Sequence, residues 1–305
     1  MILAPKIALD PNDVQETYFR RAAGIARFAY NWALAEWQRQ DAAWPADPSW
    51  SKPSDPAVRR QLKAIKADPF PWMRDGTKNA PQQMALVDLG QAFKNVFAGT
   101  AAYPTFHTQG QHNSFSLTND QFTVKGRKVQ IPKLGWVRMH ESLRFVGKVL
   151  GGTISRLADH WFLSVTVEMP DPLVVRCENQ AVVGVDWGVS ALATRSTGEK
   201  IVGPKGYAAA QKQRRRWQQH FSRQMDAAKV RAGLNPGQSP QGMPLARSQK
   251  MQKTQRRIAR LHAQMANIRA DAVHQLTTDL VQRRDVIAME DLNGAGMLKN
   301  KSHCR

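Results

Sequence analysis

A long amphipathic helix followed by a short apolar strand dominates the second half of this sequence. Seven apolar residues recur at the helical period along one face: Ile258, Leu261, Met265, Ile268, Ala272, Leu276 and Leu280. The run 286–289 then predicts a strand, and the earlier run 181–194 predicts another, with a turn at 196–198 and a return strand at 200–202. Because strands joined by a long helical connection pair in parallel, the pattern predicts an α/β sheet. The connecting helices are expected over 208–280, with a break at the Gly/Pro-rich stretch 233–244.

Each of the two main predicted strands carries an acid. Asp186 lies between Val185 and Trp187, and Glu290 directly follows 286–289. Burying an unpaired carboxylate costs several kcal/mol, so an acid in an apolar strand indicates a rim position or a cation partner. Taken singly, each acid is more often turn chemistry or a solvated strand end. Together, on neighbouring parallel strands, they predict catalytic and metal-ligating carboxylates for Mg²⁺-dependent phosphodiester cleavage.

The chain is strongly basic. Its 305 residues include 44 Lys and Arg against 24 Asp and Glu, a formal net charge of +20 that calls for a polyanionic partner. Between 211 and 260 the only acid is Asp226, so the oppositely charged pairs that support a solvated helix face are missing. The predicted nucleic-acid-binding residues are Arg20 and Arg27 in the first helix and Lys212, Arg214, Arg215, Arg216, Arg223, Lys250, Lys253, Arg256, Arg257 and Arg260. Trp217 fits base stacking and core packing equally well.

The first hundred residues predict a short strand at 6–9 and then mainly helices. Their apolar stripes are Ile25, Phe28, Trp32 and 34–37, and Leu86, Leu89, Phe93 and Phe97, with a loop expected at 41–55. Residues 103–169 change to β character. Strands are predicted at 114–117, 121–124, 128–131, 136–139, 153–157 and 161–167, with turns that include Gly151-Gly152. This spacing is typical of an antiparallel sheet or a small barrel.

Several classes of protein are disfavoured. No apolar run approaches the ~20 residues of a bilayer span, and no secretory signal pattern opens the chain, so a cytoplasmic, nucleoid-associated bacterial protein is expected. With only Cys177 and Cys304, there is neither a disulfide framework nor a zinc knuckle.

Two strand motifs resemble the RuvC motifs of the TnpB/OrfB family of bacterial insertion sequences. Gly-Val-Asp-Trp-Gly at 184–188 is similar to the first motif and Ile-Ala-Met-Glu-Asp-Leu-Asn at 287–293 to the second. The resemblance extends to 253–280, to Arg27, Asn31 and Leu34, and to 132–135. It runs through nearly the whole chain and is specific in combination.

The resemblance implies an RNA-guided DNA endonuclease related to type V CRISPR effectors, with a guide RNA and target DNA as partners. The implied fold is a multidomain α+β chain. It comprises a small β-barrel wedge domain (1–10 and 101–172), an inserted helical recognition region (11–100) and an RNase H-like RuvC domain (173–305). By position, Asp186 and Glu290 are the first two Mg²⁺ ligands.

The family pattern continues into a four-cysteine zinc element and a third acidic motif, and nothing in this sequence matches either. We therefore expect the RuvC domain to be incomplete at its C-terminus, the Mg²⁺ site to be incomplete, no zinc in this chain, and impaired cleavage. The alternative is a non-catalytic RNA- or DNA-binding protein derived from such a nuclease.

Overall fold

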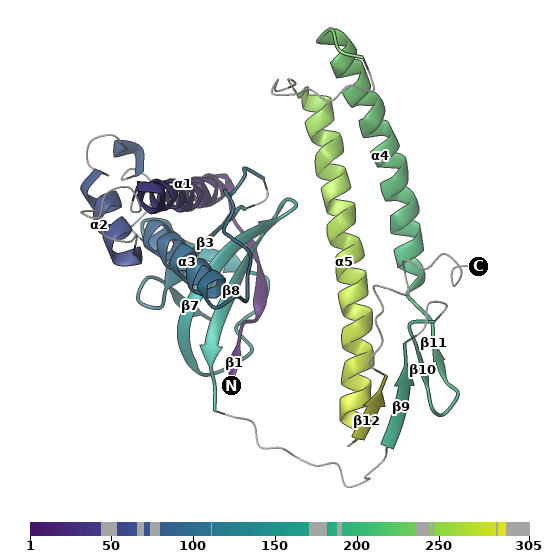
Figure 1. Cartoon of the computed structure of the whole chain (residues 1–305). Coiled ribbons are helices and arrows are strands. Elements are labelled where there is room, and N and C mark those ends of the chain that lie inside the picture. The colour runs from purple at the N-terminus through teal and green to yellow at the C-terminus, as the bar shows by residue number, and fades with distance from the viewer. Residues whose placement is uncertain are drawn as a thin grey trace. The chain divides into compact units, whose positions relative to one another are not determined.

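The computed structural model divides the chain into two compact units, Met1–Pro172 and Leu173–Arg305 (Figure 1). It describes residues 1–43, 54–65, 70–73, 80–110, 112–170, 182–187, 191–235, 245, 247–284 and 286–290, and only the backbone at 55, 65, 71 and 80. Among the described residues, every helix of membrane-spanning length is too polar to cross a bilayer.

The helices of the first unit are α1 (Asp13–Ala43), α2 (Asp55–Ile65) and α3 (Ala80–Phe97), with a 3₁₀ turn at Pro71–Met73. Helix α1 begins with a reciprocal cap in which the Asn12 side chain accepts from the Gln15 amide (2.9 Å) and the Gln15 side chain accepts from the Asn12 amide (3.1 Å). The predicted stripe of α1 is buried at Ile25, Leu34 and Trp37. The stripe of α3 ends earlier than predicted, because Phe97 is 76% exposed.

Eight strands of the first unit form one antiparallel sheet. They are β1 (Ile2–Leu3), β2 (Lys6–Asp10), β3 (Ser114–Thr118), β4 (Thr123–Lys125), β5 (Lys128–Ile131), β6 (Gly135–Met139), β7 (Lys148–Leu157) and β8 (His160–Glu168). The order is β3-β7-β8-β2-β6-β5-β4, with β1 added to β8. Strand β2 thus lies between β8 and β6, and the helices α1, α2 and α3 follow β2 and precede β3 in the chain. No ladder joins β3 to β4 among the described strands.

The turn predicted at Gly151-Gly152 is wrong, since both glycines lie inside β7 and pair with β3 and β8. The reason is steric. A Cβ on Gly152 would lie 2.8 Å from the Phe122 ring, and one on Gly151 would lie 3.2 Å from the Leu117 carbonyl oxygen. These glycines permit close approach within the sheet rather than a reversal of the chain.

The second unit is a four-stranded sheet with a helical hairpin. Its elements are β9 (Val182–Asp186), β10 (Ala193–Arg195), β11 (Lys200–Ile201), α4 (Lys205–Arg231), α5 (Gln249–Arg283) and β12 (Val286–Met289). The sheet order is β11-β10-β9-β12, and β12 pairs in parallel with β9, as predicted. Helices α4 and α5 run in opposite directions alongside each other (Figure 1).

The single strand predicted at 181–194 is wrong, because β9 and β10 are antiparallel and Thr194 pairs with Asp186. The apolar pattern of the run 181–194 gave no indication of this antiparallel pairing. The core of this unit is small. Val183, Val185 and Ala193 pack with Leu276 and Leu280 of α5, and the partly buried side chains of Trp187 and Ile287 pack against this cluster.

Candidate metal centre and nucleic-acid surface

The two predicted carboxylates occur at equivalent ends of neighbouring strands. In the β9–β12 ladder Val185 lies opposite Met289, so the next residues, Asp186 and Glu290, leave the sheet side by side at its carboxyl edge. Neighbouring strands lie about 4.8 Å apart. The two acids are more than a hundred positions apart in the sequence, and the parallel pairing brings their backbones to one rim.

Strand alternation puts both acids on the same face. Val183 and Val185 are buried against α5, whereas Val182 and Asp186 are exposed. On β12 Ile287 packs into that core, and Val286, Ala288 and the following Glu290 are exposed. Side chains two residues apart share a face of a sheet. Asp186 and Glu290 therefore lie on the face turned away from α5, accessible to solvent and to a hydrated ion.

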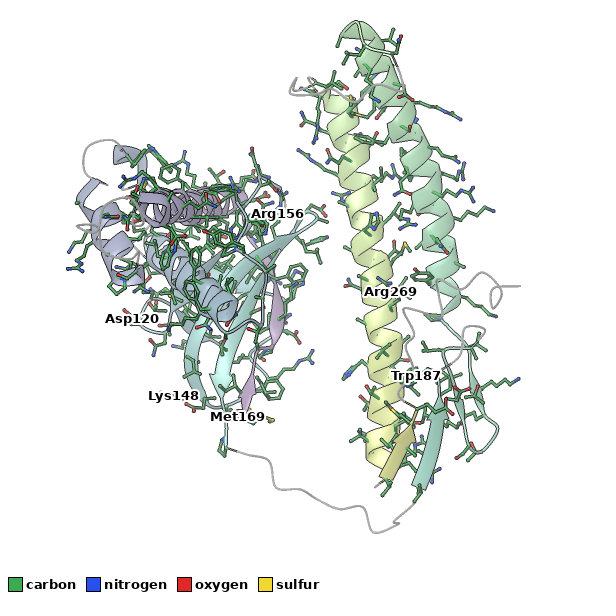
Figure 2. The ribbon with its side chains drawn as sticks, in the orientation of Figure 1. Asp120, Lys148, Arg156, Met169, Trp187 and Arg269 are labelled. Carbon is green, nitrogen blue, oxygen red and sulfur yellow. The ribbon has the colours of Figure 1, made fainter. Side chains whose placement is uncertain are left out.

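Polar contacts hold the sheet beneath this rim. The Gly184 amide donates to Ser196 Oγ (3.1 Å), and the Ser196 amide donates to the Gly184 carbonyl (2.8 Å). The Arg195 side chain, 14% exposed, forms ion pairs with Glu199 (2.6 Å) and with Asp279 of α5. These contacts tie β10 to both β9 and the helix that covers the sheet. Figure 2 labels Trp187, which directly follows β9 beside this sheet.

Within the described ranges no group of three or more His, Cys, Asp or Glu is placed to hold a metal. Among the described residues, the donors at the rim are thus the carboxylates of Asp186 and Glu290. Magnesium is commonly held by one or two carboxylates with several waters and substrate phosphates. The residues present fit one hydrated divalent ion, and Asp291 lies outside the described residues.

The predicted basic residues of the second unit form an exposed surface along the helical hairpin. Nine of the ten are exposed and Arg214 is half-buried: Lys212, Arg214, Arg215, Arg216 and Arg223 on α4, and Lys250, Lys253, Arg256, Arg257 and Arg260 on α5. Asp226, the only acid of this stretch, lies 3.8 Å from Lys229. The surface therefore keeps a large net positive charge, as phosphate binding requires.

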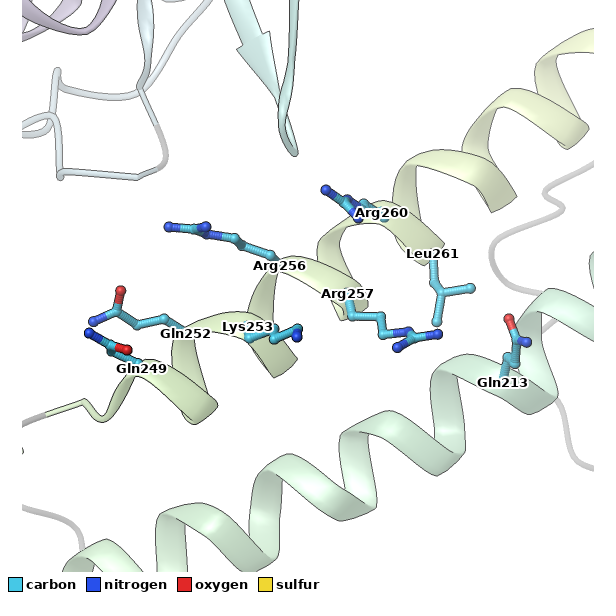
Figure 3. Close-up of a pocket in the computed structure, with 8 residues that line it drawn as sticks. All are labelled: Gln213, Gln249, Gln252, Lys253, Arg256, Arg257, Arg260 and Leu261. Atoms are coloured by element: carbon cyan, nitrogen blue, oxygen red, sulfur yellow. The ribbon is translucent and has the colours of Figure 1, made fainter. Parts of the chain in front are cut away.

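Two grooves lie on this hairpin. One, of about 810 Å³, is lined by Gln213, Gln249, Gln252, Lys253, Arg256, Arg257, Arg260 and Leu261 (Figure 3). The second, of about 390 Å³, is lined by Gln213, Arg216, Trp217, His220 and Arg257. Trp217 is half-buried at this groove, beneath the Arg257 guanidinium, which lies 4.5 Å from the centre of the indole ring.

The two predicted cations of the first unit have different surroundings. Arg20 forms an ion pair with Glu16 one helical turn away (2.7 Å). Arg27 is half-buried and lines a cavity of about 50 Å³ beside Tyr30 and His107. Arg20 is thus partly neutralised and Arg27 partly enclosed, and their contact with nucleic acid stays a prediction.

Sequence reasoning missed an aromatic stack in the first unit. The rings of Tyr30 and His107 are parallel with centroids 3.7 Å apart, and His112 stacks on His107 at 3.9 Å. Asn31 holds this segment in place. Its side chain donates to the His107 carbonyl (2.9 Å) and accepts from the His107 amide (2.7 Å). The signal available in the sequence was Asn31, a polar residue beside the buried face of a long helix.

This stack predicts a pH dependence of stability. Burial, with smaller effects from His112 and Arg27, lowers the pKa of His107 to about 4. Between pH 6.5 and 4 the unfolded chain binds a proton that folded His107 does not, so the free energy of unfolding of this unit should fall as the pH falls. His107→Phe keeps an aromatic ring and should flatten the slope between pH 6.5 and 5, measured by urea denaturation.

His160→Phe is the matched control, because the His160 side chain, at the start of β8 in the same unit, is 71% exposed. It should leave that slope unchanged. A slope that is the same in His107→Phe and in the unsubstituted chain would contradict the assignment to His107.

Comparison with known proteins places the chain in a family. Residues 164–301 match a sequence family described as "Probable transposase" of the OrfB/IS605 group. Residues 1–42 match one described as "Helix-turn-helix domain"; in this chain they comprise β1, β2 and nearly all of the continuous helix α1.

Full-length relatives agree with that match. The chain is 31% identical over 296 residues to "Putative RNA-guided DNA endonuclease InsQ" of Escherichia coli K12, which covers 97% of this chain and 67% of that protein. A "Putative RNA-guided DNA endonuclease" of Streptomyces pristinaespiralis is 29% identical, covering 95% and 67%. A solved Cas12f1–sgRNA–target DNA complex aligns over 99% of this chain and 76% of that chain at 13% identity and a TM-score of 0.33, too loosely to match positions. From the first relative and the family match, the chain belongs to the TnpB/OrfB family of transposon-encoded proteins.

Proposed function

We propose that this chain is an RNA-guided nucleic-acid-binding protein with a Mg²⁺-dependent phosphodiester-cleaving site at the carboxyl ends of β9 and β12. The observation that carries the proposal is the β9–β12 register, which brings Asp186 and Glu290 to one rim and one face of the sheet. The names of its relatives, RNA-guided DNA endonucleases, support the choice of guide RNA and target DNA as partners.

The two carboxylates and the basic hairpin have separate tasks. Asp186 and Glu290 would hold the metal, and Mg²⁺, when bound, lowers the pKa of a water and neutralises charge on the scissile phosphate. The hairpin cations bind backbone phosphates and so hold the strand beside the rim, an electrostatic and sequence-independent contribution. Base pairing with an RNA would then select the sequence.

The proposed domains follow from the chain order. The interleaving of β2 between β8 and β6 supports a wedge domain made of 1–10 and 101–172, with 11–100 as an inserted recognition region. An RNase H-like domain of the RuvC type at 173–305 is supported by the order of the elements. A strand is followed by an antiparallel return, a helical crossover and a parallel strand.

A second candidate is a binding protein that does not cleave. It is favoured by the donor count, because a two-metal mechanism needs more ligands than the two carboxylates that the described residues supply. In this case the basic surface would bind RNA or DNA with the same affinity whether or not Asp186 and Glu290 are present.

Manganese binding tests the metal site directly. Electron paramagnetic resonance of free Mn²⁺, titrated with the full chain, should show binding that weakens at least tenfold in Asp186→Ala and in Glu290→Gln, because each change removes one of two charged ligands. Asp226→Ala is the matched control. It removes the same charge from α4 about 30 Å along the helix from its start near the sheet, and should bind Mn²⁺ normally.

Cleavage of labelled DNA in Mg²⁺ separates the two candidates. Nicking that disappears in Asp186→Ala supports the nuclease, and nicking that survives this change removes Asp186 from the site. Nucleic-acid binding without any nicking, unchanged in Glu290→Gln, supports the binding protein.

A further inference from the structure

The two grooves of the α4–α5 hairpin are parts of one surface, since Gln213 and Arg257 line both. The first is lined by cations and amides, and the second contains an aromatic ring. Figure 3 shows Arg257 reaching from α5 toward α4, at the junction of the two. A ligand that spans both grooves would meet positive charge at one end and a planar apolar surface at the other.

Helical spacing groups the side chains that line the surface into one stripe on each helix. Lys253, Arg256, Arg257 and Arg260 fall at i, i+3, i+4 and i+7 on α5, and Gln213, Arg216, Trp217 and His220 repeat this spacing on α4. On α5, Arg257 points toward α4, whereas Arg256 and Arg260 extend away from it (Figure 3). All five charged side chains that line the surface are cationic: Arg216, Lys253, Arg256, Arg257 and Arg260.

Trp217 is not packed like a core residue. It is half-buried, the Arg257 guanidinium lies 4.5 Å from its ring centroid, and the His220 ring meets it edge-on at 5.7 Å and 87°. Arg257 is itself exposed, so it can leave the indole without opening the core. A nucleobase stacks on tryptophan more strongly than an exposed arginine does.

We propose that this surface binds an unpaired nucleotide of a single-stranded segment, with its base stacked on Trp217 and its phosphates on the α5 cations. Arg257 moves from the indole ring to a phosphate when the base arrives. The inference deepens the proposed nucleic-acid function and rests on it. It also makes the binding selective, because bases inside a duplex are stacked on each other and cannot reach the ring.

The test is fluorescence anisotropy with the full chain in EDTA, which removes any contribution from the metal site. The probes are a uridine-rich RNA, a thymidine-rich DNA and a blunt-ended DNA duplex without a loop, all of equal charge. Trp217→Ala should weaken binding of the single strands roughly tenfold, with an unchanged salt slope, and binding of the duplex less than twofold. Trp217→Phe should restore most of the affinity. Arg257→Gln should instead lower the salt slope by about one.

Trp136→Ala is the matched control, because Trp136 is 43% exposed on the other unit; it should change no affinity more than twofold. The proposal is overturned if Trp217→Ala weakens single strands and duplex equally, or if Trp217→Phe binds single strands no better than Trp217→Ala while its circular dichroism matches the unsubstituted chain. A loss confined to the RNA or to the DNA probe identifies which strand occupies the groove. Because metal is absent throughout, these outcomes are independent of whether Asp186 and Glu290 cleave.

Discussion

Nucleic-acid binding by this chain is expected to weaken roughly 10³- to 10⁵-fold between 50 and 200 mM salt, as it does for proteins that neutralise six to ten phosphates. The hairpin carries ten predicted phosphate-binding side chains, and the single acid in that stretch is already paired with Lys229. Each phosphate that is neutralised releases condensed counterions, so the logarithm of the association constant should fall linearly with the logarithm of salt concentration. Filter binding of duplex DNA over this range measures the slope.

The position of the charge can be tested with two quadruple variants. Changing Lys253, Arg256, Arg257 and Arg260 to Gln should reduce the slope by about 3 to 4, since each neutralised phosphate accounts for close to 0.9 of it. A control that changes Lys94, Lys125, Lys128 and Lys148 to Gln removes equal charge from exposed sites of the first unit and should change the slope by less than about one. Equal effects of the two variants would show that net charge, not the hairpin surface, governs binding.

Trp161→Ala is expected to destabilise the first unit by about 3–5 kcal/mol, a large part of the roughly 5–15 kcal/mol typical of a folded domain. Trp161 is 2% exposed, its ring centroid lies 5.1 Å from that of Phe19, and the Arg156 guanidinium lies 5.9 Å from its ring. Removing the indole leaves a cavity between α1 and the sheet. Urea denaturation monitored by near-ultraviolet circular dichroism measures the loss.

The second unit provides an internal reference for that experiment. The described residues of its apolar cluster all belong to the second unit, so the helical signal of α4 and α5 should persist at urea concentrations that unfold the Trp161→Ala sheet. Trp136→Ala, an exposed tryptophan on β6, should cost less than about 0.5 kcal/mol. A cost below about 1 kcal/mol for Trp161→Ala would mean that the core collapses around the missing ring.

Elements with strong local patterns could be predicted closely. The strands at 128–131 and 286–289 have the predicted bounds, and the helix stripe ending at Leu280 is buried at Leu261, Met265, Leu276 and Leu280. Strand and helix periods are properties of consecutive residues and are readable without the fold. The errors occurred where a distant neighbour decides. Gly152 lies in a strand, where the nearby Phe122 ring leaves no room for a side chain. Phe97 is exposed because α3 packs against the core through Phe93 instead.

For the candidate site, local patterns were enough to predict that two acids end neighbouring parallel strands, because a helical crossover leaves few alternatives in topology. They also predicted the concentration of positive charge on the connecting helices. Three features emerge only in the folded chain: both acids share the face turned away from α5, Asp279 pairs with Arg195, and Arg257 covers Trp217. These contacts depend on how the antiparallel helices align with each other and with the sheet. That alignment is set by packing between segments far apart in the chain, which no local pattern encodes.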